Sequence, residues 1–337
     1  MKRITIADVA AQANVSKSTV SQFLNKRYEY MSESTRERIK LAIEELDYRP
    51  NTVARSLTQK STFTVGVIVA NILHSFSTHI IRAIENKFYE TGFHIIVCNA
   101  DDEPEKEKEY IEMLLAKQVD GIIIFPTGGN VDLYKKMKQS RFPLVFMDRT
   151  LADLGIDTVL LDNDKAAELA VTKFVENGYN RIAIVTTSII RNISPRIERI
   201  QGYKNTLKKH RLTVNLDYVK TANADAIPSA LEELFKLEER PDAILAGNDI
   251  VLMEILKYIK KYDLKIPEDV AVIGIDDVPF ASFYTPSITT ISQPMIEMAN
   301  LAVKLLMKQI NKKERNVPEI YRLQPKLIER ESTNPLQ

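Results

Sequence analysis

Between residues 63 and 275 the sequence alternates short, mainly apolar runs with longer segments of helical periodicity. Two of the runs span residues 63–69 and 119–126, and they are apolar at successive positions rather than at every second one. Runs of this kind are typical of parallel strands that helices cover on both faces. The alternation therefore predicts an α/β fold built on doubly wound parallel sheets.

The predicted elements divide into two series of similar length. The expected strands cover residues 63–69, 93–98, 119–126, 144–147, 157–161, 182–186, 218–219, 243–246 and 270–275. The expected helices cover residues 80–89, 104–115, 133–137, 166–176, 196–209, 229–235 and 250–262. We expect one lobe over about 62–161 and a second over about 162–291. Ligands of such sheets bind beyond the carboxyl ends of the strands, so the cleft between the lobes is the expected pocket.

The first 25 residues predict two short helices joined by a tight turn. The first helix covers about residues 6–13, and residues 14–15 form the turn. Ser16 is a good N-cap for the second helix, because its hydroxyl can accept from free backbone N–H groups. Val20 and Leu24, four residues apart, face the core. The outer face carries Lys17, Ser18, Ser21 and Gln22. Such a helix fits the DNA major groove, and an ordinary surface helix pair is the alternative.

A third helix and a marginal fourth segment follow. Residues 32–46 have helical spacing with Ser32 as the cap, and the helix has to end before Pro50. Residues 51–58 predict one or two helical turns, too short to be stable alone in water. Leu57 would protrude from this segment, and it suits a wedge inserted into the DNA minor groove.

Three motifs of this head resemble the lactose/galactose-repressor (LacI/GalR) family: ITIADVA at 4–10, VSKSTVS at 15–21 and YRPN at 48–51. The resemblance implies a periplasmic-binding-protein-like body and a dimeric repressor of transcription that responds to a sugar or another metabolite. It also implies that the segment from 291 and the expected helix 295–310 cross back to the first lobe. No heptad tail follows the expected strand 321–328, so we expect a homodimer.

These observations predict three domains. Residues 1–48 form a helix-turn-helix DNA-binding domain, and residues 49–61 form a hinge helix and linker. Residues 62–337 form an effector-binding and dimerisation domain. Its N-lobe is expected to combine about 62–161 with 292–322, and its C-lobe to combine about 162–291 with 323–337.

The predicted DNA contacts separate into base readers and contacts that position the head. Lys17, Ser18 and Gln22 are the expected base readers. The other expected DNA-binding residues are Thr5, Ser16, Thr19, Ser21, Asn25, Asn51, Ala54 and Leu57. Many members of the family carry Arg at the position of Gln22. Because Arg favours guanine and Gln favours adenine, we expect a shifted operator sequence.

Polar residues follow several predicted strands, where they could accept hydrogen bonds from sugar hydroxyls. Capping of the following helix is the alternative for each of them. Asn248 and Asp276 match ligand-binding motifs of the family, and Arg199 matches the arginine that grips the effector. Phe76 stands where relatives place an aromatic side chain against the ligand. The predicted effector-binding residues are Asn71, Phe76, Asp148, Arg191, Arg196, Arg199, Asn248, Asp276 and Gln293.

The nature of the effector follows from the arginines. Arg191 and Arg196 add positive charge near Arg199, and guanidinium groups hold carboxylates in a bidentate fork. This suggests an acidic sugar or sugar acid, and the resemblance extends to repressors of 2-keto-3-deoxygluconate and uronic-acid use. The family favours release of DNA by the effector, while corepression remains open.

His74 and His79 lack the spacing of metal ligands and are interpreted as surface or internally bonded histidines.

Composition excludes several other classes of protein. Residues 1–60 carry 11 Lys and Arg against 7 Asp and Glu in a chain of net charge +1, so the head is the basic end. A single cysteine, Cys98, excludes an internal disulfide, and no apolar run resembles a signal peptide or a membrane span. We therefore expect a cytoplasmic protein.

The rival interpretation is a sugar-converting enzyme that uses Asp148 and Asp276 as acid and base. Because no phosphate loop, nucleophile elbow or metal cluster is present, we expect no enzyme activity, cofactor or metal.

Overall fold

The computed structural model describes residues 4–48, 61–151, 154–311 and 317–334. The chain consists of two compact units, residues 1–62 and 63–337. The predicted hinge-helix contacts Asn51, Ala54 and Leu57 lie outside the described residues.

The described residues 4–48 of the N-terminal unit form three helices, α1 (Ile6–Gln12), α2 (Lys17–Leu24) and α3 (Glu33–Glu45). Ser16 caps α2, because its hydroxyl accepts from the amide of Thr19 at 3.1 Å. One apolar residue from each helix, Val9, Val20 and Ile39, is completely buried in a common core. This small core fixes α2 against the other two helices and leaves its polar face outward.

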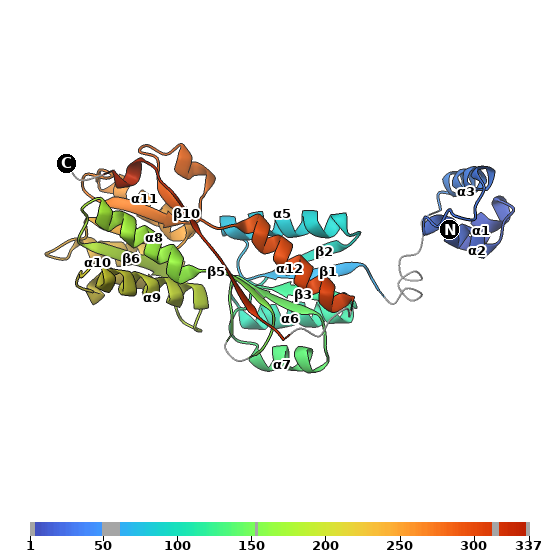
Figure 1. Cartoon of the computed structure of the whole chain (residues 1–337), viewed down its shortest axis with the longest axis horizontal. Coiled ribbons are helices and arrows are strands. Elements are labelled where there is room, and N and C mark those ends of the chain that lie inside the picture. The colour runs from blue at the N-terminus through green and yellow to red at the C-terminus, as the bar shows by residue number, and fades with distance from the viewer. Residues whose placement is uncertain (1–3, 49–60, 152–153, 312–316, 335–337) are drawn as a thin grey trace. The chain divides into compact units, whose positions relative to one another are not determined.

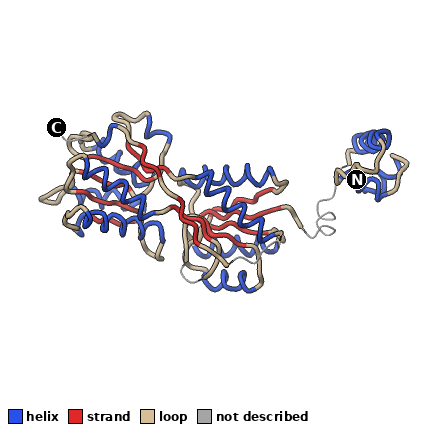
Figure 2. Tube along the Cα trace, viewed as in Figure 1, coloured by secondary structure: helices blue, strands red, loops and turns tan. Residues whose placement is uncertain are grey.

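The second unit contains two six-stranded sheets, each forming the centre of one lobe (Figures 1 and 2). The first sheet has the order β11-β5-β4-β3-β1-β2 and consists of β1 (Thr64–Val69), β2 (His94–Asn99), β3 (Gly121–Ile124), β4 (Leu144–Met147), β5 (Thr158–Leu161) and β11 (Ile320–Leu323). The second has the order β12-β10-β9-β8-β6-β7 and consists of β6 (Ile182–Thr187), β7 (Val219–Ala222), β8 (Ala243–Ala246), β9 (Ala271–Ile275), β10 (Thr289–Ser292) and β12 (Lys326–Ile328). All the pairings are parallel except that between β10 and β12.

Helices cover both faces of each sheet, which explains why the strands are apolar at successive positions. In the first lobe, α5 (Ser75–Glu90) and α12 (Met295–Ile310) pack on one face, while α6 (Pro104–Ala116) and α7 (Val131–Gln139) pack on the other. In the second lobe, the two faces are covered by α8 (Asn163–Glu176) with α9 (Ser194–Lys209), and by α10 (Ile227–Phe235) with α11 (Asp249–Lys261). The predicted doubly wound α/β fold is confirmed.

The chain crosses between the lobes three times, after β5, after β10 and between β11 and β12. The expected continuous strand over 321–328 is wrong, since β11 and β12 are separate strands in different sheets. Gln324 and Pro325 lie between them, and a proline cannot donate to a sheet ladder. The expected helix over 80–89 begins earlier, at Ser75. The earlier start of α5 brings the amide of Ser75 to Asp249 of the other lobe, and the break between β11 and β12 brings Gln324 to Asp162.

Candidate functional site

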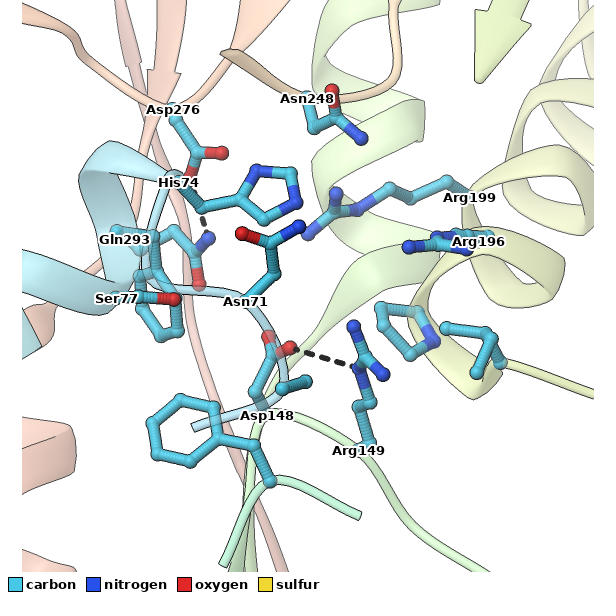
Figure 3. A pocket seen from close by; sticks show the side chains of 15 residues that line it. Asn71, His74, Ser77, Asp148, Arg149, Arg196, Arg199, Asn248, Asp276 and Gln293 are labelled. Atoms are coloured by element: carbon cyan, nitrogen blue, oxygen red, sulfur yellow. Dashed lines mark hydrogen bonds and ion pairs between the residues drawn. The ribbon is translucent and has the colours of Figure 1, made fainter. Parts of the chain in front are cut away.

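A pocket lies between the two lobes, near the carboxyl ends of the central strands (Figure 3). About 490 Å³ of it is not occupied by atoms, and part of this space is open solvent. It is lined by Ala70, Asn71, His74, Phe76, Ser77, Phe125, Asp148, Arg149, Ile193, Pro195, Arg196, Arg199, Asn248, Asp276 and Gln293. Eight of the nine predicted effector-binding residues are in this set, and Arg191 is not.

The N-lobe supplies one aromatic wall and one carboxylate. Phe76, in the first turn of α5, is buried and packs edge-on against Phe125 with ring centroids 6.2 Å apart. Asp148 follows β4 and has a φ of +65°, a left-handed conformation that is costly for a side chain other than glycine. Backbone strain of this kind persists where the surrounding structure fixes a functional group.

Arg199 comes from α9 in the C-lobe and is almost completely buried. Its Nε donates to Asn163 Oδ1 at 2.8 Å and its Nη1 donates to the carbonyl of Gly247 at 2.6 Å. A Cβ atom at Gly247 would lie 2.7 Å from Thr186, so the backbone can approach this closely only with glycine. These bonds fix the guanidinium group at the pocket wall, where it can bind an anionic or hydroxyl group.

Asn248 both caps α11 and lines the pocket. Its Oδ1 accepts from the amide of Val251 at 2.9 Å, so it caps α11, and its Nδ2 donates to Thr187 Oγ1 at 3.0 Å. The capping alternative therefore holds for this residue, although its side chain also lines the pocket.

Asp276 follows β9, is buried, and has a backbone φ of +88°. Burial raises the pKa of Asp276 to about 6, with Arg199 opposing the shift and Asp249 adding to it. Gln293 donates to Asp276 Oδ1 at 2.6 Å. The Oε1 atom of Gln293 is buried and has no hydrogen-bond partner among the described residues, so a bound hydroxyl group could satisfy it.

Three guanidinium groups line the pocket: Arg149, Arg196 and Arg199. Arg149 Nη1 donates to Asp102 Oδ1 at 2.7 Å, and Arg196 Nη2 lies 3.8 Å from Asp102 Oδ2. Burial and the neighbouring Arg149 lower the pKa of Arg196 to about 10. Burial alone would raise the pKa of Asp102, but the two arginines outweigh it, and the net pKa is lowered. The Nε of Arg149 is buried without a hydrogen bond in the described part of the chain, and Asp148 Oδ2 lies 3.8 Å from it (Figure 3).

Arg191 was predicted to bind the effector, and the structure places it elsewhere. Its side chain is exposed and donates to the backbone carbonyl of Asp102 instead of lining the pocket. The backbone at Arg191 is in the left-handed region, with a φ of +69°. Arg149, which follows Asp148 directly, lines the pocket although it was not among the predicted effector-binding residues.

The pocket role of His74 was not predicted. His74 precedes α5, and its Nδ1 lies 2.6 Å from Asp249 Oδ1 in the other lobe, while the amide of Ser75 donates to Asp249 Oδ2 at 2.6 Å. Because a carboxylate only accepts, Nδ1 is the donor of this hydrogen bond, and the His74 side chain also lines the pocket. These partners are far apart in sequence and follow strands of different sheets, β1 and β8, so no local pattern indicates the pair.

In the head, the expected base readers Lys17, Ser18 and Gln22 are all exposed on α2. Other predicted contacts already bond within the head. The side-chain amide of Asn25 donates to the carbonyl of Ser21 at 2.8 Å. The hydroxyl of Ser16 lies within 2.8 Å of the hydroxyls of both Ser18 and Thr19, and the Thr5 hydroxyl donates to Asp8 at 2.7 Å. The side chains of Lys17 and Gln22 are thus the most available for a partner.

Comparison with known proteins identifies the family. Residues 5–51 match the model of bacterial regulatory proteins of the lacI family, and residues 171–333 match a periplasmic binding protein-like domain. The chain is 48% identical to the probable HTH-type transcriptional regulator EndR of Paenibacillus polymyxa, over 97% of this chain and 98% of that one. The chain belongs to the LacI family. It is 34% identical to the HTH-type transcriptional regulator KdgR of Bacillus subtilis, over 97% of both chains.

Solved structures agree with this assignment. The Lac repressor bound to ONPG in a repressed state matches 98% of this chain and 100% of its own, with a TM-score of 0.86 and 25% identity. This LacI-family chain is a DNA-binding transcriptional regulator, and the rival interpretation as a sugar-converting enzyme is not supported by its relatives. In the described ranges, no helix has the length and apolarity needed to cross a membrane.

The exposure of Gln22 leads to a prediction about the operator. Replacing Gln22 by Arg is expected to move the preferred base at one position per half-site from adenine towards guanine, by about 1–3 kcal/mol. Selection from a randomised duplex library would measure this change. The variant Gln12→Arg, on the exposed surface of α1, is the control and should leave the profile unchanged. An identical profile for Gln22→Arg would show that this residue does not read a base.

Proposed function

We propose that this regulator is a cytoplasmic repressor that binds a palindromic operator as a homodimer and is released by a sugar acid bound in the inter-lobe cleft. The head over residues 1–48 would contact DNA, and the segment 49–61 would connect it to the effector-binding domain over 62–337. The dimer is supported by the family, whose solved structures include a Lac repressor dimer bound to operator.

The composition of the pocket carries the proposal for the effector. Three arginines line it, and one of their buried nitrogens, Arg149 Nε, has no hydrogen bond among the described residues. A carboxylate of the effector would satisfy this donor and bind the guanidinium groups with charge-assisted hydrogen bonds. Asp148, Asp276 and the free oxygen of Gln293 would accept from sugar hydroxyls. The two sets of groups suit a ligand with both an acid and several hydroxyls.

The switch would work through closure of the cleft. The pocket groups come from both lobes, so a ligand that contacts both binds one lobe arrangement better than another. Only this difference in affinity can shift the population of conformations. A change in the angle between the lobes would then reach the heads through residues 49–61.

Isothermal titration calorimetry with 2-keto-3-deoxygluconate and with glucose tests the effector class. We expect binding of the acid and at least a tenfold weaker binding of the neutral sugar, since each good charged hydrogen bond contributes about 1.5–3 kcal/mol. A preference for glucose would refute the sugar-acid proposal. Retardation of an operator fragment with and without the acid shows the sign of the response: loss of the complex supports induction, and a stronger complex would show corepression.

A further inference from the structure

The three crossings between the lobes are each hydrogen-bonded to the pocket or to its direct neighbour. At the first crossing, Asn163 accepts from Arg199 at 2.8 Å, and at the second, Gln293 donates to Asp276 at 2.6 Å. At the third, Arg322 of β11 binds Glu198, the residue that precedes Arg199 in α9. In Figure 1 the dark-red terminal segment that contains β11 and β12 runs from one lobe into the other.

Glu198 is the centre of this arrangement. Arg322 Nη2 donates to Glu198 Oε1 at 2.7 Å and Nη1 donates to Oε2 at 3.0 Å, which is a bidentate pair. Asn163 Nδ2 also donates to Glu198 Oε2, at 3.0 Å. A continuous chain of hydrogen bonds therefore runs from Arg322, in the sheet of the N-lobe, through Glu198 and Asn163 to Arg199 in the pocket.

Charge makes Arg322 hard to replace in this position. The bonded Glu198 raises the pKa of Arg322, and Asp162 and Asp164 raise it further. Burial and the negative charges of Glu198 and Asp162 raise the pKa of Asp164, while Arg322 opposes that shift. Gln324 donates to Asp162 at 3.1 Å, so the first and third crossings are also bonded to each other. Without Arg322, three carboxylates at the crossings would repel one another.

We propose that Arg322 and Glu198 are positioning residues that hold Arg199 in the pocket and set the angle between the lobes. The pair joins the sheet of one lobe to a helix of the other, on the side of the cleft where the chain crosses. Its link to effector binding rests on the function proposed above. Its effect on the lobe arrangement does not, because that can be measured without any effector.

Hydrogen exchange of the effector-free protein tests the inference. The amides of Ser75 and Thr150 donate across the cleft, to Asp249 Oδ2 at 2.6 Å and to Ser194 Oγ at 2.9 Å, so their exchange reports opening of the lobes. In Arg322→Gln we expect both amides to exchange roughly 2- to 30-fold faster, the range expected for a residue along a coupling network. The amide of Ala271, which donates to the carbonyl of Asp242 at 2.8 Å at the amino end of β9, is the internal reference and should not change.

A matched control separates this role from the loss of any ion pair. Lys209 lies on the same helix as Glu198 and pairs with Glu168 at 2.7 Å, outside the chain of bonds to the pocket. Lys209→Gln should leave the two cross-cleft amides unchanged, and Arg322→Lys should restore part of the protection. Glu198→Gln should reproduce Arg322→Gln, and the double variant should add little more.

Unchanged exchange at Ser75 and Thr150 in both single variants would overturn the inference, and so would an equal effect of Lys209→Gln. Faster exchange together with no binding of 2-keto-3-deoxygluconate would uphold the positioning role while refuting the proposed effector. The two failures are therefore distinguishable.

Discussion

The Arg199→Met variant is expected to respond to the effector only at concentrations about 30- to 1,000-fold higher than the unmodified protein, a loss of about 2–4 kcal/mol. Arg199 is buried, and its bonds to Asn163 and to the carbonyl of Gly247 fix it at the pocket wall. Methionine fills similar space but cannot bind a carboxylate, and it leaves these acceptors without their donor. Calorimetry and operator retardation across an effector titration would measure the loss.

The control is Arg240→Met, which removes an exposed arginine that pairs with Asp269 at 3.9 Å. This variant should keep the effector response and operator affinity of the unmodified protein. Arg199→Met should still bind operator in the absence of effector, because the change lies outside the head. An undiminished response of Arg199→Met would show that the arginine does not contact the effector.

The residues that could be predicted from the sequence are those whose position follows from a strand end. Asp148 and Asp276 stand directly after apolar runs, and parallel strands bring their carboxyl ends to one edge of each sheet. Arg199 was found only through its match to the family motif, since a helical position alone does not show which face meets a pocket. The fold class was predictable because alternating apolar runs and helices allow few other arrangements.

The remaining contacts depend on backbone conformation and long-range pairing. His74 binds Asp249, 175 residues further along the chain, and no local pattern reveals such a partner. Arg191 was predicted to bind the effector, but its side chain donates to the backbone carbonyl of Asp102 and does not line the pocket. The division of residues 320–328 into two strands depends on which sheet each one joins, which periodicity does not show.

Replacing Asp276 by asparagine is expected to stabilise the fold at neutral pH while weakening the effector response. Burial raises the pKa of Asp276 from 3.8 to about 6. Between these two pH values the folded chain keeps a proton that the unfolded chain has lost, so its stability falls as pH rises through this window. Above pH 6 the loss is complete, at about 3 kcal/mol. Asparagine has no charge to bury, and it tolerates the φ of +88° better than most residues.

Thermal unfolding between pH 4 and pH 7.5 would measure this effect. We expect the midpoint of Asp276→Asn to match that of the unmodified protein near pH 4 and to exceed it by roughly 5–10 °C at pH 7. Effector binding should weaken at least tenfold, because a neutral amide oxygen is a poorer acceptor than a carboxylate.

The variant Asp277→Asn, at the neighbouring position, is the matched control for the expected gain in stability and loss of effector binding. Asp277 accepts from Arg330 Nη2 at 2.8 Å and from Thr290 Oγ1 at 2.7 Å, and it does not line the pocket. Asp277→Asn should therefore lower the unfolding midpoint and leave effector binding unchanged. The unfolding midpoint should therefore rise in Asp276→Asn and fall in Asp277→Asn. Such a result would show that Asp276 binds the ligand at a cost in stability, whereas Asp277 stabilises the fold. A lower midpoint for Asp276→Asn at pH 7 would mean that the buried carboxylate contributes to folding rather than opposing it.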